Sequence, residues 1–228
     1  MTAGEFRSGD SCELPPLVIV GSGGHAVSVA NVAISAGYAI ECFVDEKRQG
    51  STMLGYRIVG DMAGLGNIHA YCYAMAIGDN ALRERVSGDL LAAWPELRFP
   101  PLVHESATIS SFAEIGPGTV VMPQAVIGPA ARVGRFCVLN TRASLDHDSV
   151  MQDFSSLAPG AVTGGNVKIG FRSAISIGAV IKHGISVGAD SVLGANSYLH
   201  HDLPDNQVAY GSPARIIRSR KTGEAYLK

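Results

Sequence analysis

The pattern of apolar and polar positions changes near the middle of the chain, and its two parts predict different folds. Residues 17–20, "LVIV", form a short apolar run ending at a glycine, which is typical of a buried parallel strand. Residues 39–45 and 73–79 predict two further strands, whereas residues 27–37 and 80–94 have the spacing of helices. The apolar side chains on one face of the second helix are Leu82, Val86, Leu90 and Leu91. The first part is therefore expected to be a small α/β domain.

The second part has a strict period of six. From Val103 to Leu199, fifteen of the seventeen residues at six-residue intervals are Ile, Leu or Val. Four positions after each of them, fifteen of seventeen residues are Ala, Ser, Thr, Cys or Val. The position directly after the aliphatic residue is Gly seven times and Asn or Asp twice, types that tolerate the left-handed backbone of a sharp corner. This period predicts a solenoid of short parallel strands with the aliphatic and small residues inside.

The Pro-rich segment 95–101 is the expected domain boundary. It divides the chain into a flexible leader (1–15), a Rossmann-like α/β domain (16–100), a solenoid domain (101–210) and a C-terminal tail (211–228). The tail contains the basic run "RIIRSRK", which could bind a phosphate-bearing ligand but is more simply a solvated tail.

The composition excludes several classes of protein. The net charge is −2 and no basic patch stands out beyond the tail, so nucleic-acid binding has little support. Four cysteines lack CxxC spacing, which indicates a reducing compartment and no zinc site. No apolar run approaches the roughly 20 residues that span a membrane, and the N-terminus lacks the features of a signal peptide. A cytoplasmic protein is expected.

A glycine-rich loop, "GSGGHA" (21–26), lies between the first predicted strand and helix. Its glycines would let backbone approach a phosphate, and the helix N-terminus would offer free N–H groups and a positive dipole end. With Asp45 further on, the loop also fits a dinucleotide-binding fingerprint. Three interpretations are open at this point: nucleotide-sugar binding, nicotinamide or flavin binding, and a plain tight turn.

The stretch "LDHDSV" (145–150) places a histidine between two aspartates within the six-residue pattern. Leu145 keeps the inward position, Ser149 takes the small position, and Asp146 takes the expected corner. His147 and Asp148 are left to face outward. A neutral histidine is the natural general base near pH 7, and an adjacent carboxylate can orient it and stabilise its protonated form. The alternative is that these two side chains are solvated surface.

The six-residue pattern resembles the hexapeptide-repeat acyltransferases, whose fold is a left-handed parallel β-helix with three repeats in each triangular coil. "YGSPARII" (210–217) is similar to the closure that follows the last coil in that family. "GSGGHA", "FVDE" and "AIGDN" ahead of the repeats resemble the group of sialic acid O-acetyltransferases and bacillosamine-type N-acetyltransferases. The resemblance implies a homotrimer with active sites between neighbouring subunits.

The resemblance implies an enzyme that moves acetyl from acetyl-CoA to the amino group of a nucleotide-linked amino sugar, of the UDP-4-amino-sugar type, in surface-glycan biosynthesis. His147 would be the general base and Asp148 its orienting partner. The alternatives are a sugar O-acetyltransferase of the sialic acid type, a catalytically silent nucleotide-sugar-binding protein, and a nicotinamide-dependent enzyme. No histidine constellation predicts a metal site.

The resemblance also implies binding residues, matched position by position. The substrate-binding residues would be Gly23, Gly24 and His25 for the diphosphate or sugar, Asp45 and Glu46 for the nucleoside, Gly78 in the same cleft, and Asn140 near the sugar. The residues lining the coenzyme A slot would be Ser156, Gly165, Ile177 and Ala195. Ser156 departs from the N-acetyltransferase group, which has a second histidine there. His25 could instead pack at the helix start, and Asn140 could serve a corner.

Overall fold

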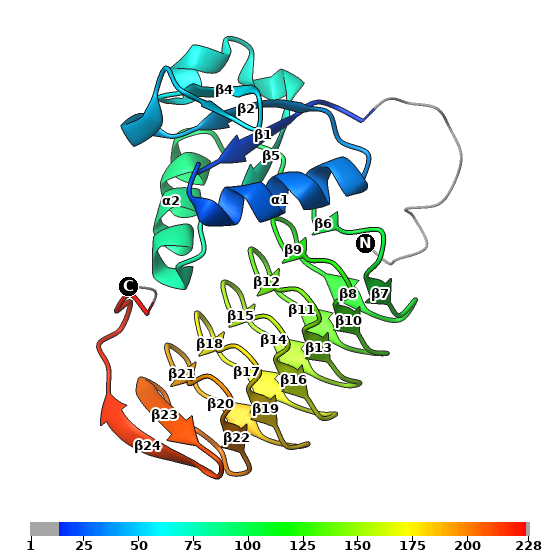
Figure 1. Cartoon of the computed structure of the whole chain (residues 1–228), viewed down its shortest axis with the longest axis vertical. Helices are drawn as coiled ribbons and strands as arrows, with labels where there is room; N and C mark the ends of the chain where they lie inside the picture. Colours follow the sequence, from blue (N-terminus) through cyan, green and yellow to red (C-terminus); the bar gives the residue numbers. More distant parts are fainter. Residues whose placement is uncertain (1–13, 227–228) are drawn as a thin grey trace.

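The computed structural model of the chain describes residues 14–226, which form two stacked parts (Figure 1). An α/β domain lies at one end of the molecule, and a prism of short parallel strands extends from it. Residues 1–13 of the expected leader, with Cys12, lie outside the described residues. Within residues 14–226, no helix has both the length and the apolar character needed to cross a bilayer.

The α/β domain is one five-stranded sheet in the order β3-β4-β2-β1-β5, with only β3 antiparallel. The strands are β1 (Leu17–Val20), β2 (Ile40–Val44), β3 (Thr52–Met53), β4 (Tyr56–Val59) and β5 (Cys72–Met75). The helices are α1 (Gly24–Ser35) and α2 (Asn80–Ala93), with 3-10 turns η2 (Glu46–Arg48), η3 (Met62–Leu65) and η4 (Ile68–Ala70). Every side chain of β1 is buried because both faces of the sheet are covered: Leu17 and Ile19 pack in one apolar cluster with α1, and Val18 and Val20 pack in another on the opposite face. The three predicted strands and two predicted helices are confirmed.

The second part is a left-handed parallel β-helix with three faces, and each predicted aliphatic position ends one two-residue strand. Face 1 contains β6 (Leu102–Val103), β9 (Val120–Val121), β12 (Val138–Leu139), β15 (Ser156–Leu157), β18 (Ala174–Ile175) and β21 (Val192–Leu193). Face 2 contains β7 (Thr108–Ile109), β10 (Val126–Ile127), β13 (Ser144–Leu145), β16 (Val162–Thr163), β19 (Val180–Ile181) and β22 (Tyr198–Leu199). Face 3 contains β8 (Glu114–Ile115), β11 (Arg132–Val133), β14 (Val150–Met151), β17 (Lys168–Ile169) and β20 (Ser186–Val187). The small position is also inside, and Cys137 is fully buried there.

The left-handed backbone of the corners is not where the sequence analysis placed it. It occurs three positions after the aliphatic residue, at φ +56° for Asp148 and +58° for Arg142, and not directly after it at Asp146 or Asn140. The glycines directly after the aliphatic residues have another cause. A Cβ on Gly116 or Gly170 would overlap the backbone of the next coil. Close stacking of the coils therefore selects glycine at that position, while the corner itself accepts ordinary residues.

Helix α2 meets face 1 with polar side chains, and this corrects the apolar face inferred from its spacing. The buried residues of α2 are Asn80, Arg83 and Ser87. Leu82 is 38% exposed. The other predicted apolar residues, only partly buried, are Val86, Leu90 and Leu91. The side of α2 that faces the β-helix meets backbone carbonyls at the coil corners, such as those of Phe136 and Phe154, and only donor groups can satisfy them.

The segment expected to be a solvated tail is solvent-exposed over residues 215–219, as predicted, but it forms regular structure. Strands β23 (Gln207–Gly211) and β24 (Ala214–Ser219) form an antiparallel pair that continues face 1 beyond β21. The chain then returns towards the α/β domain, and the C-terminal end of the described residues lies beside α2 (Figure 1). The basic run is therefore mostly strand β24, with Arg218 paired to Glu224 rather than free.

Candidate active site

His147 and Asp148 form a hydrogen-bonded pair on the edge of the prism between faces 2 and 3. Leu145 in β13 and Ser149 before β14 are fully buried and anchor the corner that carries the pair. His147 Nδ1 and Asp148 Oδ2 are 2.8 Å apart, and the two side chains are 55% and 63% exposed. The structure therefore brings together the two residues that the sequence predicted as catalytic.

The backbone of this corner is held by two further side chains. Asp146 Oδ1 accepts the amide N–H of His147 at 2.7 Å, and Thr163 Oγ1 accepts the amide N–H of Asp146 at 3.0 Å. Thr163 is one of the two residues that break the inward aliphatic series, and it is buried. Sequence reasoning missed its role, although that break in the series was the available signal. Asp146 and Thr163 together fix the position from which His147 projects.

The electrostatics of the pair suit a general base. The hydrogen bond with Asp148, and then the charge of Asp146, raise the pKa of His147 above its ordinary value of 6.5. A carboxylate on Nδ1 favours the tautomer that carries its proton on Nδ1, so Nε2 presents a lone pair. Nε2 is therefore the atom of this site that can take a proton from a bound acceptor.

Gly165 lies directly against the ring of His147, one coil further along the same edge. A Cβ at Gly165 would overlap Nε2, Cε1 and Cδ2 of the imidazole, so only glycine leaves room for the ring in this position. Among residues 14–226, none accepts a hydrogen bond from the amide N–H of Gly165. The ring of His147 thus lies against a stretch of backbone whose N–H is not used by another described residue.

A cavity of about 800 Å³ opens in the α/β domain at the glycine loop. Its lining includes residues 21–25 of the loop, residues 44–47 after β2, residues 76–79 after β5, and one side of α2. A Cβ on Gly23 or Gly24 would meet no atom within 4 Å, so these glycines present bare backbone to open space. The predicted residues Gly23, Gly24, His25, Asp45, Glu46 and Gly78 all line this one cavity.

The carboxylate of Asp45 is hydrogen-bonded to other groups of the same chain. Its Oδ2 accepts the amide N–H of Ser22 at 3.0 Å and the Ser22 hydroxyl at 2.7 Å, and its Oδ1 accepts the amide N–H of Lys47 at 3.0 Å. Burial acts to raise the pKa of Asp45, but these hydrogen bonds outweigh it and the pKa lies below its ordinary value. Asp45 thus ties the glycine loop to the end of β2, whereas the neighbouring Glu46 is exposed.

His25 is a neutral histidine in the first turn of α1. Burial, followed by the charge of Arg83, lowers the pKa of His25 to about 4. Its Nε2 is buried and has no hydrogen-bond partner among the described residues. The ring therefore contributes a neutral wall to the cavity rather than a positive charge for a phosphate.

The residues predicted for coenzyme A are not gathered at one place within the chain. Gly165 lies on the edge of His147, whereas Ile177 and Ala195 lie on the edge between faces 1 and 2. Asn140, which was predicted to lie near the sugar, is on that same edge between faces 1 and 2. Ser156 in β15 is buried, and its hydroxyl contacts Asn80 at 3.1 Å and Tyr226 at 3.2 Å. Both partners come from the same chain, so the Ser156 hydroxyl is not free to replace the histidine of the N-acetyltransferase group.

The glycine-loop cavity and His147 lie on opposite sides of one chain. The α/β domain sits on face 1, which α1 contacts through β6 and β9 and which Asn80 of α2 reaches at Ser156. His147 projects from the edge between faces 2 and 3, which is the edge opposite face 1. The body of the β-helix therefore separates the two sites within a single chain.

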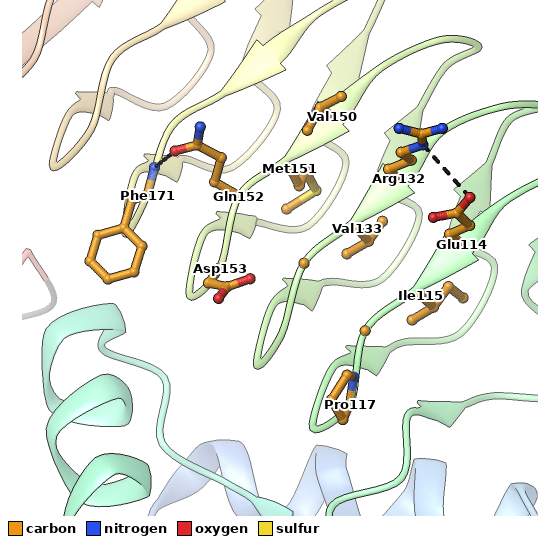
Figure 2. Close-up of a pocket in the computed structure, with 12 residues that line it drawn as sticks. Glu114, Ile115, Pro117, Arg132, Val133, Val150, Met151, Gln152, Asp153 and Phe171 are labelled. Atoms are coloured by element: carbon orange, nitrogen blue, oxygen red, sulfur yellow. Dashed lines mark hydrogen bonds and ion pairs between the residues drawn. The ribbon is translucent and has the colours of Figure 1, made fainter. Parts of the chain in front are cut away.

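A second cavity of about 760 Å³ lies along face 3 and its edge with face 1 (Figure 2). It is lined by Glu114 and Arg132, 3.7 Å apart, and by Gln152, whose side chain accepts the amide N–H of Phe171. The side chains of Glu114 and Arg132 project from neighbouring coils, as Figure 2 shows. No residue predicted as functional lines this groove. Within residues 14–226, no cluster of three or more His, Cys, Asp or Glu side chains could hold a metal.

Both parts of the chain match known sugar acetyltransferases. Residues 16–90 match the family described as the PglD N-terminal domain. The GDP-perosamine N-acetyltransferase of Escherichia coli O157:H7 is 28% identical over 188 residues, which are 79% of this chain and 83% of that protein. The match therefore extends over most of both chains.

Two solved structures match nearly the whole chain. A GDP-perosamine N-acetyltransferase from Caulobacter crescentus, solved as a histidine-to-alanine variant with CoA and GDP-perosamine, is 30% identical with a TM-score of 0.83, over 90% of this chain and 97% of that one. The acetyltransferase domain of PglB from Neisseria gonorrhoeae, in complex with acetyl coenzyme A, is 32% identical with a TM-score of 0.84, over 90% and 100%. The chain therefore belongs to the hexapeptide-repeat sugar N-acetyltransferases of the bacillosamine and perosamine type, and it uses acetyl-CoA as its co-substrate.

Proposed function

We propose that this enzyme acetylates the amino group of a nucleoside-diphosphate-linked amino sugar, a precursor of surface glycans, with His147 as the general base. The observation that carries the proposal is the hydrogen-bonded His147–Asp148 pair, whose imidazole lies against the backbone of Gly165. The glycine-loop cavity, with bare backbone at Gly23 and Gly24, would hold the nucleotide part of the acceptor.

The proposed reaction needs no groups beyond the two substrates, His147, Asp148 and Gly165. The sugar amine attacks the thioester carbonyl carbon, and His147 Nε2 removes a proton from the attacking nitrogen. The carbonyl oxygen becomes an oxyanion, to which the Gly165 N–H donates. As the intermediate collapses, the carbon–sulfur bond breaks and the CoA thiolate leaves, receiving the proton from His147. Asp148 stabilises the imidazolium between the two proton transfers.

We propose further that the active site is shared between chains of a homotrimer. The cavity and His147 of one chain lie on opposite sides of the β-helix, so a bound sugar would reach the His147 of a neighbour. Face 2 carries an exposed column, Val126, Val162, Val180 and Tyr198, whose members are 37% to 41% exposed. Apolar area of this kind is typical of a subunit contact. Ile177 and Ala195, on the neighbouring edge, would then contact coenzyme A at the site of the adjacent subunit.

The acceptor is tested by assaying acetyl-CoA turnover with GDP-linked amino sugars, UDP-linked 4-amino sugars and sialic acids. The family resemblance implied a UDP-linked sugar, whereas two of the relatives above act on or bind GDP-perosamine, so GDP-linked amino sugars are assayed first. We expect acetylation of the amine on one nucleotide sugar. Turnover with sialic acids alone would replace this proposal with O-acetylation.

The base is tested with His147→Ala, which should lower kcat by roughly 10²–10⁴-fold while nucleotide-sugar binding is retained. His104→Ala is the matched control, because His104 occupies a corner of the first coil and, among residues 14–226, its imidazole is hydrogen-bonded only to Ser106. Turnover by His147→Ala at the rate of the control would refute the assignment.

A further inference from the structure

Arg83 in α2 is a buried cation whose direct contacts are all neutral. Its side chain is 1% exposed. Nε donates to Phe136 O, Nη1 donates to Ile77 O and Gly78 O, and Nη2 donates to Asn80 Oδ1 and Phe154 O, at distances of 2.7 to 3.0 Å. The guanidinium thus uses its full set of donors on oxygens that carry no charge. Burial lowers the pKa of Arg83, which reflects the cost of keeping this charge out of water.

These contacts connect the nucleotide cavity to the β-helix. Ile77 and Gly78 lie in the loop between β5 and α2, and both line the cavity. Phe136 and Phe154 are the left-handed corner residues of two successive coils, and their rings stack 5.4 Å apart. One side chain therefore ties the cavity wall to two coils of the β-helix.

Tyr226, near the C-terminus, contacts the Gly78 carbonyl, which also accepts from Arg83. Its hydroxyl donates to Gly78 O at 3.2 Å, and its amide N–H donates to Asp79 Oδ2 at 3.2 Å. The hydroxyl also contacts Ser156 Oγ, and Ser156 is hydrogen-bonded to Asn80. We call Asn80, Arg83, Ser156 and Tyr226 the loop clamp. Three segments far apart in sequence meet in it, and all of them converge on the cavity wall.

The charge of Arg83 also reaches the glycine loop. It is the second cause, after burial, of the low pKa of His25, which lines the same cavity. A buried ion is costly unless a partner offsets it, and the groups in contact with Arg83 do not. Arg83 contacts the Gly78 loop from the β-helix side, and the cavity lies on the other side of that loop. A diphosphate bound in the cavity would supply the negative charge that Arg83 lacks.

We infer that Arg83 and Tyr226 are positioning residues for the nucleotide sugar: they hold the Gly78 carbonyl wall of the cavity against the β-helix, and Arg83 places a positive charge behind the bound diphosphate. This inference rests on the proposed function, because it assumes that the glycine-loop cavity takes the nucleotide part of the acceptor. It assigns no contact with the reacting atoms to either residue.

The test compares the variants Arg83→Met, Arg83→Lys and Tyr226→Phe in the full-length enzyme. Calorimetry measures the Kd of the acetylated nucleotide sugar and, separately, of acetyl-CoA; steady-state assays separate KM from kcat. The matched control is Glu84→Gln, which removes another contact between α2 and the β-helix, the ion pair with Arg172, without touching the Gly78 loop. Circular dichroism confirms the fold of each variant.

We expect Tyr226→Phe to weaken nucleotide-sugar binding about tenfold, which corresponds to about 1.4 kcal/mol, and Arg83→Met to weaken it more. Arg83→Lys should lie between wild type and Arg83→Met because it keeps the charge but loses the fork of donors. Acetyl-CoA affinity and kcat at saturating sugar should stay within about threefold of wild type, as they should in Glu84→Gln.

Unchanged nucleotide-sugar affinity in folded Tyr226→Phe, or in a folded Arg83 variant, overturns the inference. So does an equal loss of nucleotide-sugar and acetyl-CoA affinity, because it would show a general structural effect. If Arg83→Met does not fold, Tyr226→Phe and Arg83→Lys still decide the question. A wild-type enzyme that binds no nucleotide sugar overturns this inference together with the proposed function, whereas normal wild-type binding with unaffected variants overturns this inference alone.

Discussion

The imidazole of His147 lies against Gly165 of the next coil, at a position where a single methyl group would overlap the ring. The corner that carries His147 is fixed by Asp146 and Thr163, so the ring has a defined place and the glycine below it leaves that place open. Geometry of this kind matters because a general base contributes only when it is held within hydrogen-bond reach of the proton it removes.

Gly165→Ala should lower kcat by roughly 10–100-fold, since displacement of a base by about 1 Å is enough for a loss of this size. Gly170→Ala is the control. A Cβ there overlaps the backbone of Gly188, so it should lower the melting temperature without a comparable loss of kcat. Equal kcat values for the two folded variants would show that Gly165 serves coil packing alone.

The pH dependence of turnover should report the His147–Asp148 pair. Only neutral His147 accepts a proton, and Asp148 raises its pKa, so kcat/KM should fall as the pH drops through a value above 6.5. Asp148→Asn removes the first cause of the shift and should move this acidic limb to lower pH, with a lower plateau because the imidazolium loses its partner. If the acidic limb stays at the same pH in Asp148→Asn, Asp148 does not set the pKa of the general base.

Thr163→Val restores the inward aliphatic series but removes the acceptor for the amide N–H of Asp146. An unsatisfied buried donor costs about 1–3 kcal/mol, and the released corner should lower kcat about tenfold. Turnover is measured beside chemical denaturation. Thr163→Ser, which keeps the hydroxyl, should recover most of the activity, and failure of this recovery would point to packing as the cause.

Ser22 and Asp45 should act as one unit in nucleotide-sugar binding, because the Ser22 hydroxyl and amide both bond to Asp45 Oδ2. Ser22→Ala and Asp45→Ala should each weaken binding severalfold, and the double variant should be little worse than Asp45→Ala, as expected for coupled neighbours. Calorimetric Kd values provide the comparison. Fully additive losses would instead support the direct nucleoside contact that the sequence analysis assigned to Asp45.

Val180→Glu places a charge in the exposed apolar column of face 2. It should dissociate the proposed trimer and lower the rate of acetylation about 10²-fold or more. The separated chain should still bind the nucleotide sugar, because it keeps its nucleotide cavity. Light scattering gives the mass and calorimetry gives the affinity. Lys168→Glu on face 3 is the control, because that column is already charged. An active Val180→Glu monomer would contradict the shared active site.

Periodicity alone predicted the β-helix, because each inward position must repeat wherever identical coils stack. Periodicity also identified His147 and Asp148 as residues of their repeat that the core does not use, and the family resemblance supplied the prediction that they are catalytic. The same periodicity misassigned the corner, because glycine has two physical uses. Gly116 and Gly170 are glycine to let coils approach, and Asp148 carries the left-handed backbone. Composition cannot distinguish a close approach from a positive φ.

Local spacing in the sequence is enough to predict the two parts of the chain, the strand positions of the β-helix and the outward-facing pair of His147 and Asp148. Which polar groups are already hydrogen-bonded within the protein depends on the tertiary packing. The structure showed that Ser156 is bound by Asn80 and Tyr226, that Asp45 is bound by Ser22, and that buried Arg83 joins the cavity wall to the β-helix. Such pairings depend on segments far apart in the chain, and only the packing of α2 and the C-terminus on face 1 brings their donors and acceptors together.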